Sequence, residues 1–314
     1  MEDCASAQRV RDKLERAMGP QLITWLQEPA VVEIWLNADG TMWVARLGQG
    51  KTSAGTMEAG RAETLIANVA TCEGTTVTRK DPLLECTLPF NGARFSASIP
   101  PESPAATFNI RRPAQKIYSL DDYVQQGTLS ATQRQHLREA VQQRKNIVVA
   151  GGTGSGKTTF INAVIDEMGR ETPEDRLVII QDTAELQAKV RDQLMLFTSP
   201  RNDMNQLLRH TLRRSPDRIV VGEVRGAEAL SMLKAWNTGH DGGATSVHAN
   251  DSRSTLIRLE QLVLEGSMSP CSTLIADAVD IIVNIVKTTT GRTVREIVAV
   301  HGYRDGEYLL EELQ

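Results

Sequence analysis

The sequence predicts an α/β protein in which a smaller α+β domain precedes a larger domain with a mostly parallel sheet. From residue 146 onward, short apolar strands alternate with helical segments, which is the pattern of a parallel sheet with helices on both faces. Before residue 112, two pairs of β-rich runs are each joined by a tight-turn dipeptide, with a helical pattern between the pairs. The length of 314 residues also agrees with about two domains.

Three segments are predicted along the chain. An N-terminal α+β domain covers residues 1–112, and its hairpins turn at Asp39-Gly40 and Asn91-Gly92, dipeptides typical of hairpin turns. Residues 113–129 contain few apolar positions and are interpreted as a linker or hinge. The second domain covers residues 130–314.

Strands and helices are expected to alternate through the second domain, which ends in an antiparallel extension. Its strands are expected at residues 147–150, 176–182, 218–223, 243–250, 279–288, 293–303 and 308–310. Its helices are expected at residues 130–144, from 157 onward, and at 203–214, 226–239 and 252–266.

Composition narrows the class of protein. A net charge of −4 argues against a surface that grips nucleic acid throughout, so no direct sequence-specific nucleic-acid binding is expected. The four cysteines are widely separated and form no C-x-x-C pair, which supports neither a zinc site nor a disulfide framework. The start of the chain is charged and unlike a signal peptide, and no run approaches 18 consecutive apolar residues. A cytosolic protein is therefore expected.

Residues 146–160 carry the motif with the clearest chemistry: a buried strand, a glycine-rich turn and the start of a helix. They fit the phosphate-binding loop pattern G-x-x-x-x-G-K-[ST] without a gap. Lys157 is expected to reach the β- and γ-phosphates of ATP, and the Thr158 hydroxyl to bind Mg²⁺. The residues expected to bind the nucleotide are Gly151, Gly152, Thr153, Gly154, Ser155, Gly156, Lys157, Thr158 and Thr159.

Nucleotide hydrolysis also needs carboxylates near the metal and the attacking water, and two strands end in suitable residues. Asp182 or Glu185, in the segment after the strand at 176–182, could hold Mg²⁺. Glu223 ends the strand at 218–223 and is the candidate water-orienting residue or general base. The alternative for Glu223 is a salt bridge to Arg225. Gly222 stands where most phosphate-loop ATPases carry their metal-binding aspartate. The carboxylate for the metal must then come from elsewhere, and Asp182 and Glu185 are the candidates.

Residues 239-GHDGGATSVHAN-250 contain two histidines on either side of a glycine-rich turn, and both are candidates for the nucleotide site. His240 and His248 lie eight residues apart, which does not match the close spacing of a zinc pair. Arginines could stabilise charge on the γ-phosphate, and Arg111 and Arg112 lie at the end of the first domain.

Four motifs in this order resemble the secretion or traffic ATPases, which are the motors of type IV secretion, conjugation, type II secretion and type IV pili. The phosphate loop GGTGSGKTT is similar to theirs, and 181-QDTAE-185 resembles their Asp box. Residues 212–230 resemble their Walker B segment, and residues 239–250 their His box. The match covers about residues 107–260, and the conjugal-transfer and type IV secretion members are the most similar. Gln181 stands where an acidic residue is common, which places in doubt a metal role at residue 181. Ser246 stands where threonine is usual and keeps a hydroxyl group.

The resemblance implies a hexameric ring with ATP bound between an N-terminal domain and a RecA-like C-terminal domain. It implies that Glu185 is the Asp-box carboxylate, Glu223 the Walker B glutamate, and His240 and His248 the γ-phosphate sensors or couplers. It also implies that Arg111 or Arg112 reaches the γ-phosphate when the two domains close.

The function implied is a Mg²⁺-dependent ATP-hydrolysing motor that powers a conjugative type IV secretion system, for pilus assembly or substrate transfer. Its expected location is cytoplasmic and peripheral to a bacterial inner membrane, with inner-membrane secretion components as partners and possible transient contact with the transferred substrate. Alternatives are a type IV pilus retraction or type II secretion ATPase, a small-molecule kinase, and a nucleotide-gated scaffold.

Overall fold

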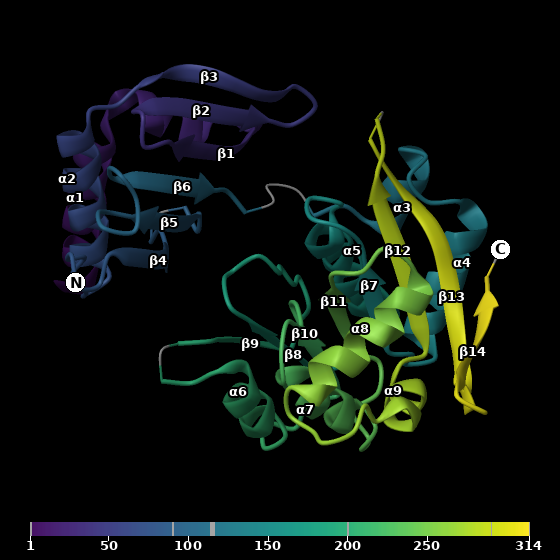
Figure 1. Cartoon of the computed structure of the whole chain (residues 1–314). Coiled ribbons are helices and arrows are strands. Elements are labelled where there is room, and N and C mark those ends of the chain that lie inside the picture. The colour runs from purple at the N-terminus through teal and green to yellow at the C-terminus, as the bar shows by residue number, and fades with distance from the viewer. Residues whose placement is uncertain (1, 90, 114–116, 200, 290, 314) are drawn as a thin grey trace. The chain divides into compact units, whose positions relative to one another are not determined.

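The computed structural model describes residues 2–89, 91–113, 117–199, 201–289 and 291–313, with side chains from residue 12 onward (Figure 1). The chain divides into two compact units, Met1–Gln115 and Lys116–Gln314. Each unit combines a sheet with helices, so the predicted mixed α/β class is confirmed. No helix of the described residues is long and apolar enough to cross a membrane.

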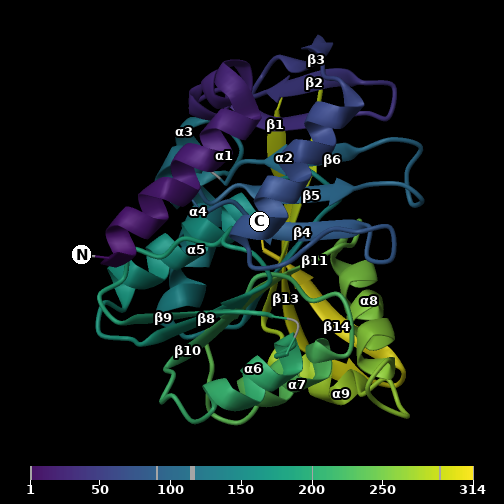
Figure 2. The ribbon, with the colours of Figure 1, turned by 90° about the vertical axis from the view of Figure 1, so that its left-hand side faces the viewer.

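The first unit is a sheet with two helices against one face. Its described residues form a six-stranded antiparallel sheet in the order β3-β2-β1-β6-β5-β4 (Figure 2). The strands are β1 (Val31–Leu36), β2 (Thr41–Arg46), β3 (Gly50–Thr56), β4 (Leu83–Thr87), β5 (Arg94–Ser98) and β6 (Thr107–Arg111). The helices are α1 (Glu2–Gln27) and α2 (Ala59–Cys72). Helix α1 is broken at Gly19, which precedes Pro20.

Alternating burial along the strands separates the two faces of this sheet. Ile34, Val44, Phe95 and Ile110 face the helices and are buried in one hydrophobic core. The opposite face carries the stacked rings of Trp35 and Trp43, and Arg94 lies directly across from Arg111. The core therefore lies on one side only, and the other face presents aromatic and charged side chains.

The second unit is built on an eight-stranded sheet in the order β14-β13-β12-β7-β11-β10-β8-β9 (Figure 1). The strands from β12 to β9 in this order are parallel, and β13 and β14 add antiparallel strands at one edge, as expected. The strands are β7 (Ile147–Ala150), β8 (Leu177–Gln181), β9 (Gln193–Phe197), β10 (Arg218–Val221), β11 (Ala244–Val247), β12 (Ile281–Lys287), β13 (Arg292–Arg304) and β14 (Glu307–Glu312).

Helices bury both faces of this sheet. Helices α3, α4 and α5 contribute to one hydrophobic core, and α6, α7, α8 and α9 contribute to another. Their bounds are α3 (Leu120–Gln125), α4 (Ala131–Gln142), α5 (Lys157–Glu171), α6 (Met204–Thr211), α7 (Glu228–Trp236), α8 (Ser252–Leu264) and α9 (Ser272–Ala278). Because both faces are covered, β7, β8, β10 and β11 are buried along their whole length, which explains their continuous apolar sequences.

Some elements differ from the sequence prediction. Helix α3 lies inside the segment 113–129 interpreted as a linker, and its Leu120 and Tyr123 are buried in the core of the second unit. Residues 114–116 of that segment lie outside the described residues. The strands β3 and β9 and helix α9 were not predicted.

Candidate active site

The phosphate loop connects β7 in the middle of the sheet to α5. Gly156 has φ of 101°, a left-handed conformation that glycine adopts without strain. A Cβ atom on Gly151 would lie 2.3 Å from the carbonyl oxygen of Ile285 and 2.5 Å from Ser155 Oγ, so a side chain does not fit there. The backbone can therefore curl closely enough to surround an anion at the N-terminus of α5.

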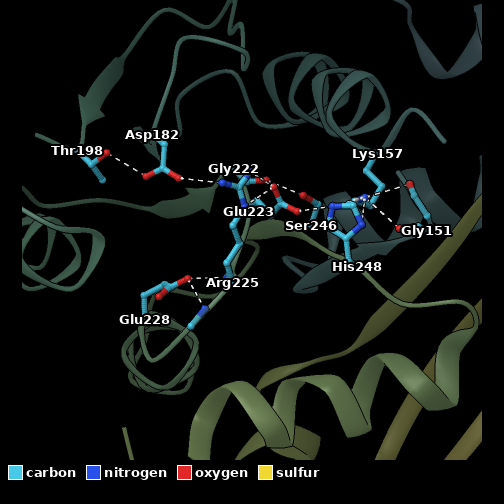
Figure 3. Close-up of polar contacts among 12 residues, drawn as sticks. Gly151, Lys157, Asp182, Thr198, Gly222, Glu223, Arg225, Glu228, Ser246 and His248 are labelled. Atoms are coloured by element: carbon cyan, nitrogen blue, oxygen red, sulfur yellow. Dashed lines mark hydrogen bonds and ion pairs between the residues drawn. The ribbon is translucent and has the colours of Figure 1, made fainter. Parts of the chain in front are cut away.

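Lys157 is largely buried, with 7% of its surface exposed, and its ammonium group is directed into the loop. Its Nζ donates to the carbonyl oxygens of Gly151 and Gly152, at 3.0 and 3.3 Å. It also lies 3.3 Å from both ring nitrogens of His248 (Figure 3). The cation expected to bind phosphates is thus held at the loop by groups that phosphate oxygens could replace.

His248 connects Lys157 to Glu223 at the carboxyl edge of the sheet. It follows β11, the strand beside β7, and its Nε2 lies 2.9 Å from Glu223 Oε1 (Figure 3). Burial and the positive charge of Lys157 lower the pKa of His248, although Glu223 acts in the opposite direction. The imidazole is therefore neutral near pH 7 and can donate one hydrogen bond while accepting another.

Glu223 follows β10, and its carboxylate makes two different contacts. Its Oε2 accepts hydrogen bonds from Arg225, with Nε at 2.8 Å. Its Oε1 is buried and forms no hydrogen bond with the described residues, because the contact with His248 lacks hydrogen-bond geometry. The salt bridge to Arg225 considered from the sequence is therefore present, and it leaves one oxygen available.

The segment after β8 is supported by Gln181. Its side-chain oxygen accepts from the backbone N–H groups of Glu185 and Leu186, at 3.0 and 2.7 Å. Asp182 accepts a hydrogen bond from Thr198 at 2.9 Å, and its other oxygen lies 3.7 Å from Arg225. Asp182 thus already has two partners, whereas Gln181 fixes the backbone position of Glu185.

A hard cation such as Mg²⁺ prefers oxygen ligands, and the site supplies a hydroxyl group and carboxylates. The candidate donors are the Thr158 hydroxyl, on the helix after β7, and the carboxylates of Asp182 and Glu185, which follow β8; β11 and β10 lie between these two strands in the sheet. Across the described residues, no group of three or more His, Cys, Asp or Glu side chains is arranged to hold a metal by itself. The donor set fits a cation that is shared with a nucleotide and takes few protein ligands.

The structure does not bring His240 to this site. It lies four residues before β11, whereas His248 follows the end of that strand. Parallel strands share their amino-terminal edge, so His240 lies at the edge of the sheet opposite the phosphate loop. The common γ-phosphate role predicted for both histidines is supported by position for His248 alone.

Arg111 and Arg112 lie in the first unit and have different environments. Arg112 donates from Nη1 to the carbonyl oxygens of Glu28 and Val31, so its guanidinium is tied to the chain before β1. Arg111 is exposed on the face of the sheet away from the helices, opposite Arg94. On its other side Arg111 lies opposite Glu33 of β1, so a carboxylate also stands across from this arginine. Sequence reasoning missed Arg94, and only strand register reveals its place.

Comparison with known proteins identifies the chain. The family described as "Type II/IV secretion system protein" matches residues 65–303, more than half of the chain. The chain belongs to this family. It is 46% identical to the "Probable conjugal transfer protein TrbB" of Sinorhizobium fredii, covering 100% of this chain and 97% of that protein. It is 44% identical to the "Conjugal transfer protein TrbB" of Rhizobium radiobacter, covering 99% and 96%.

Solved structures of traffic ATPases share the fold. The pilus retraction motor PilT with bound ADP matches with a TM-score of 0.65 and 19% identity, covering 94% of this chain and 82% of that chain. The ATPase DotB of Legionella pneumophila matches with a TM-score of 0.60 and 17% identity, covering 85% and 76%. The chain therefore shares the two-domain α/β fold of these proteins, and within the type II/IV secretion system family it is similar over its full length to conjugal transfer proteins.

Proposed function

We propose that this protein is a Mg²⁺-dependent ATP-hydrolysing hexameric motor of a conjugative type IV secretion system. The observation that carries the proposal is the row of Lys157, His248 and Glu223 beside the phosphate loop. A cation for the γ-phosphate, a neutral imidazole and an available carboxylate oxygen are the groups that hydrolysis of a nucleotide triphosphate requires.

Each of these side chains has a distinct role in the proposed reaction. Lys157 exchanges its carbonyl partners for phosphate oxygens and stabilises their charge. Glu223 Oε1 accepts a hydrogen bond from the attacking water and orients it toward the γ-phosphate. His248, between the two, donates to the γ-phosphate and so responds to its presence.

When the nucleotide is bound, Mg²⁺ would offset the negative charge of its phosphates. Thr158 and Glu185 are the residues proposed to hold it, Glu185 directly or through water. Asp182 is the other candidate, and to bind Mg²⁺ it would have to exchange its contacts with Thr198 and Arg225. The remaining residues of the loop from Gly151 to Thr159 bind the phosphates through backbone N–H groups and side-chain hydroxyls.

Arg111 is the residue of the first unit proposed to reach the γ-phosphate, together with Arg94 across the strand pair. Arg112 is less suitable because its guanidinium already stabilises backbone carbonyl groups. Such a contact would make closure of the two units depend on the nucleotide, with the chain between them as the hinge.

The place of the motor in the cell is inferred from its relatives. The two full-length relatives described above are named conjugal transfer proteins, and the chain covers nearly all of each. We infer that the hexamer acts on the cytoplasmic side of a bacterial inner membrane, bound to membrane components of the secretion system. It would couple hydrolysis to pilus assembly or to transfer of substrate.

The test is phosphate release by the purified full-length protein, measured with its mass in the presence and absence of ATP. Lys157→Ala is expected to bind ATP far more weakly, and Glu223→Gln to keep binding but lose hydrolysis. Glu174→Gln, an exposed acidic residue paired with Arg191, is the matched control and is expected to hydrolyse ATP normally. Normal hydrolysis by Glu223→Gln would contradict the proposed chemistry. Phosphate transfer only to an added acceptor would indicate a kinase instead, and binding without turnover would indicate a scaffold.

A further inference from the structure

Arg225 links two carboxylates that follow neighbouring strands of the sheet. Its Nε and Nη2 both donate to Glu223 Oε2, and its Nη1 lies 3.7 Å from Asp182 Oδ2 (Figure 3). Since β10 and β8 are adjacent and parallel, these carboxylates emerge from the same edge of the sheet. A single guanidinium therefore spans the Walker B segment and the Asp box.

The backbone of Arg225 is itself held in place. Glu228, the first residue of α7, accepts hydrogen bonds from the N–H groups of Arg225 and Gly226 at 2.6 and 2.9 Å. Burial alone would lower the pKa of Arg225, but its hydrogen bond to Glu223 and the charges of Glu223, Asp182 and Glu185 raise it above its usual value. The side chain is thus a permanent cation on a backbone that is fixed to a helix N-terminus.

The contact determines how the Glu223 carboxylate faces the site. Two donors from Arg225 occupy Oε2, so the carboxylate cannot rotate without breaking both hydrogen bonds. Its Oε1 remains buried without a hydrogen bond and lies beside His248, which in turn contacts Lys157. The available oxygen is consequently aimed at the place where the γ-phosphate and the attacking water would meet.

We propose that Arg225 is a positioning residue that orients Glu223 for the attacking water. The inference rests on the proposed function, because it assumes that Glu223 orients the water. Among the described residues, the side chain of Arg225 pairs with Glu223 and Asp182 and with no residue of the phosphate loop. Its contribution is therefore separate from the binding of the nucleotide phosphates.

The experiment replaces Arg225 in the full-length protein and separates kcat from ATP affinity. Arg225→Gln is expected to lower kcat by about ten- to a hundredfold, the effect of misplacing a reacting group by about 1 Å, with the Kd for ATP within about twofold. Arg225→Lys keeps the charge but not the fork of donors, so its kcat is expected to lie between those of the wild type and Arg225→Gln. Arg191→Gln is the matched control, since this exposed arginine pairs with Glu174 and is expected to leave kcat unchanged.

A double substitution distinguishes positioning from a general structural role. In single-turnover reactions, Glu223→Gln with Arg225→Gln is expected to be no slower than Glu223→Gln alone, because Arg225 acts through that carboxylate. If the rate loss of the double variant equals the product of the losses of the two single variants, the two residues act independently. That result, or an unchanged kcat in Arg225→Gln, would overturn the inference while leaving the proposed function intact. An active Glu223→Gln protein would overturn both. Loss of ATP binding in Arg225→Gln would also refute the positioning role.

Discussion

Asp175→Ala should strongly destabilise the second unit, because it removes the charge partner of a fully buried arginine. Arg218 has 0% of its surface exposed, and its Nε donates to Asp175 Oδ2 at 2.6 Å. The same guanidinium donates to the carbonyl oxygens of Val141 and Gly242, at 2.9 and 3.1 Å. These contacts join the start of β10, the strand that ends before Glu223, to helix α4 and to the loop before β11. After the substitution the carbonyl groups remain, but the positive charge is uncompensated.

The expected loss is about 3 to 5 kcal/mol in the free energy of unfolding, the usual cost of removing one member of a buried ion pair. For a unit of this size, that corresponds to roughly 6 to 20 °C in the melting temperature. The assay is calorimetric and urea-induced unfolding of the full-length protein. Asp192→Ala is the matched control, since its pair with Arg176 is largely exposed and is expected to contribute below about 1 kcal/mol.

The pH dependence gives a second measure of the same pair. Burial alone would raise the pKa of Asp175, but hydrogen bonds from Arg218 and Thr172 and the charge of Arg144 outweigh it and lower that pKa. A lowered carboxyl pKa stabilises the fold above its unfolded value of about 3.9, and this stabilisation is lost as the pH falls through the folded value. The difference between wild type and Asp175→Ala should therefore shrink in acid. A loss no larger than that of Asp192→Ala at pH 7 would refute the reasoning.

Three further predictions concern the site and the first unit. Lys157→Ala should weaken ATP binding by about a hundredfold, measured by calorimetric titration, because charge-assisted contacts to phosphate are lost; unchanged affinity would show that the loop does not bind the nucleotide. Burial and Lys157 lower the pKa of His248, so protonation destabilises the fold as the pH falls from about 6.5 toward the pKa of the folded state. Between pH 7 and 5 the melting temperature of His248→Asn should therefore fall less than that of the wild type, and parallel curves for the two proteins would contradict this. Arg112→Ala should cost about 1 to 3 kcal/mol in unfolding experiments and Arg111→Ala about 0.5 kcal/mol or less, while Arg111→Ala lowers ATP turnover; the reverse order would exchange their roles.

The phosphate loop and the order of strands were predictable because their signals are local. The loop pattern specifies a strand, a turn and a helix over fifteen residues, and the structure has all three. Two helix starts expected from the sequence, at residues 130 and 203, carry local capping signals: Ser130 with Gln133 caps α4, and Asp203 with Gln206 caps α6. In each case the residues that decide the conformation lie within one turn of one another.

The elements that were missed depend on distant contacts. Strand β3 contains glycine, lysine, serine and threonine with little apolar pattern, and it is a strand because it pairs with β2. Strand β9 is apolar, but its place at the sheet edge follows from pairing with β8. Arg111 and Arg112 are neighbours in sequence, yet only the register of β6 shows that the first lies on the open face. The hydrogen bonds of Arg112 are equally invisible in the sequence.

The glycine at the Walker B position has a physical explanation that joins two motifs. A Cβ atom on Gly222 would lie 3.2 Å from Gln181 Cβ, which is tighter than ordinary packing, and 3.7 Å from Leu186, so a side chain at 222 would require Gln181 to shift. Gln181 is the departure from the usual Asp box, and its side-chain oxygen accepts hydrogen bonds from the N–H groups of Glu185 and Leu186. Ser246 donates to the carbonyl oxygen of Gly222 at 2.8 Å, which keeps β10 close to β11 at the same point. Gly222 and Gln181 therefore belong to one packing arrangement, in which the absence of a side chain at 222 accommodates the side chain that holds the backbone at Glu185.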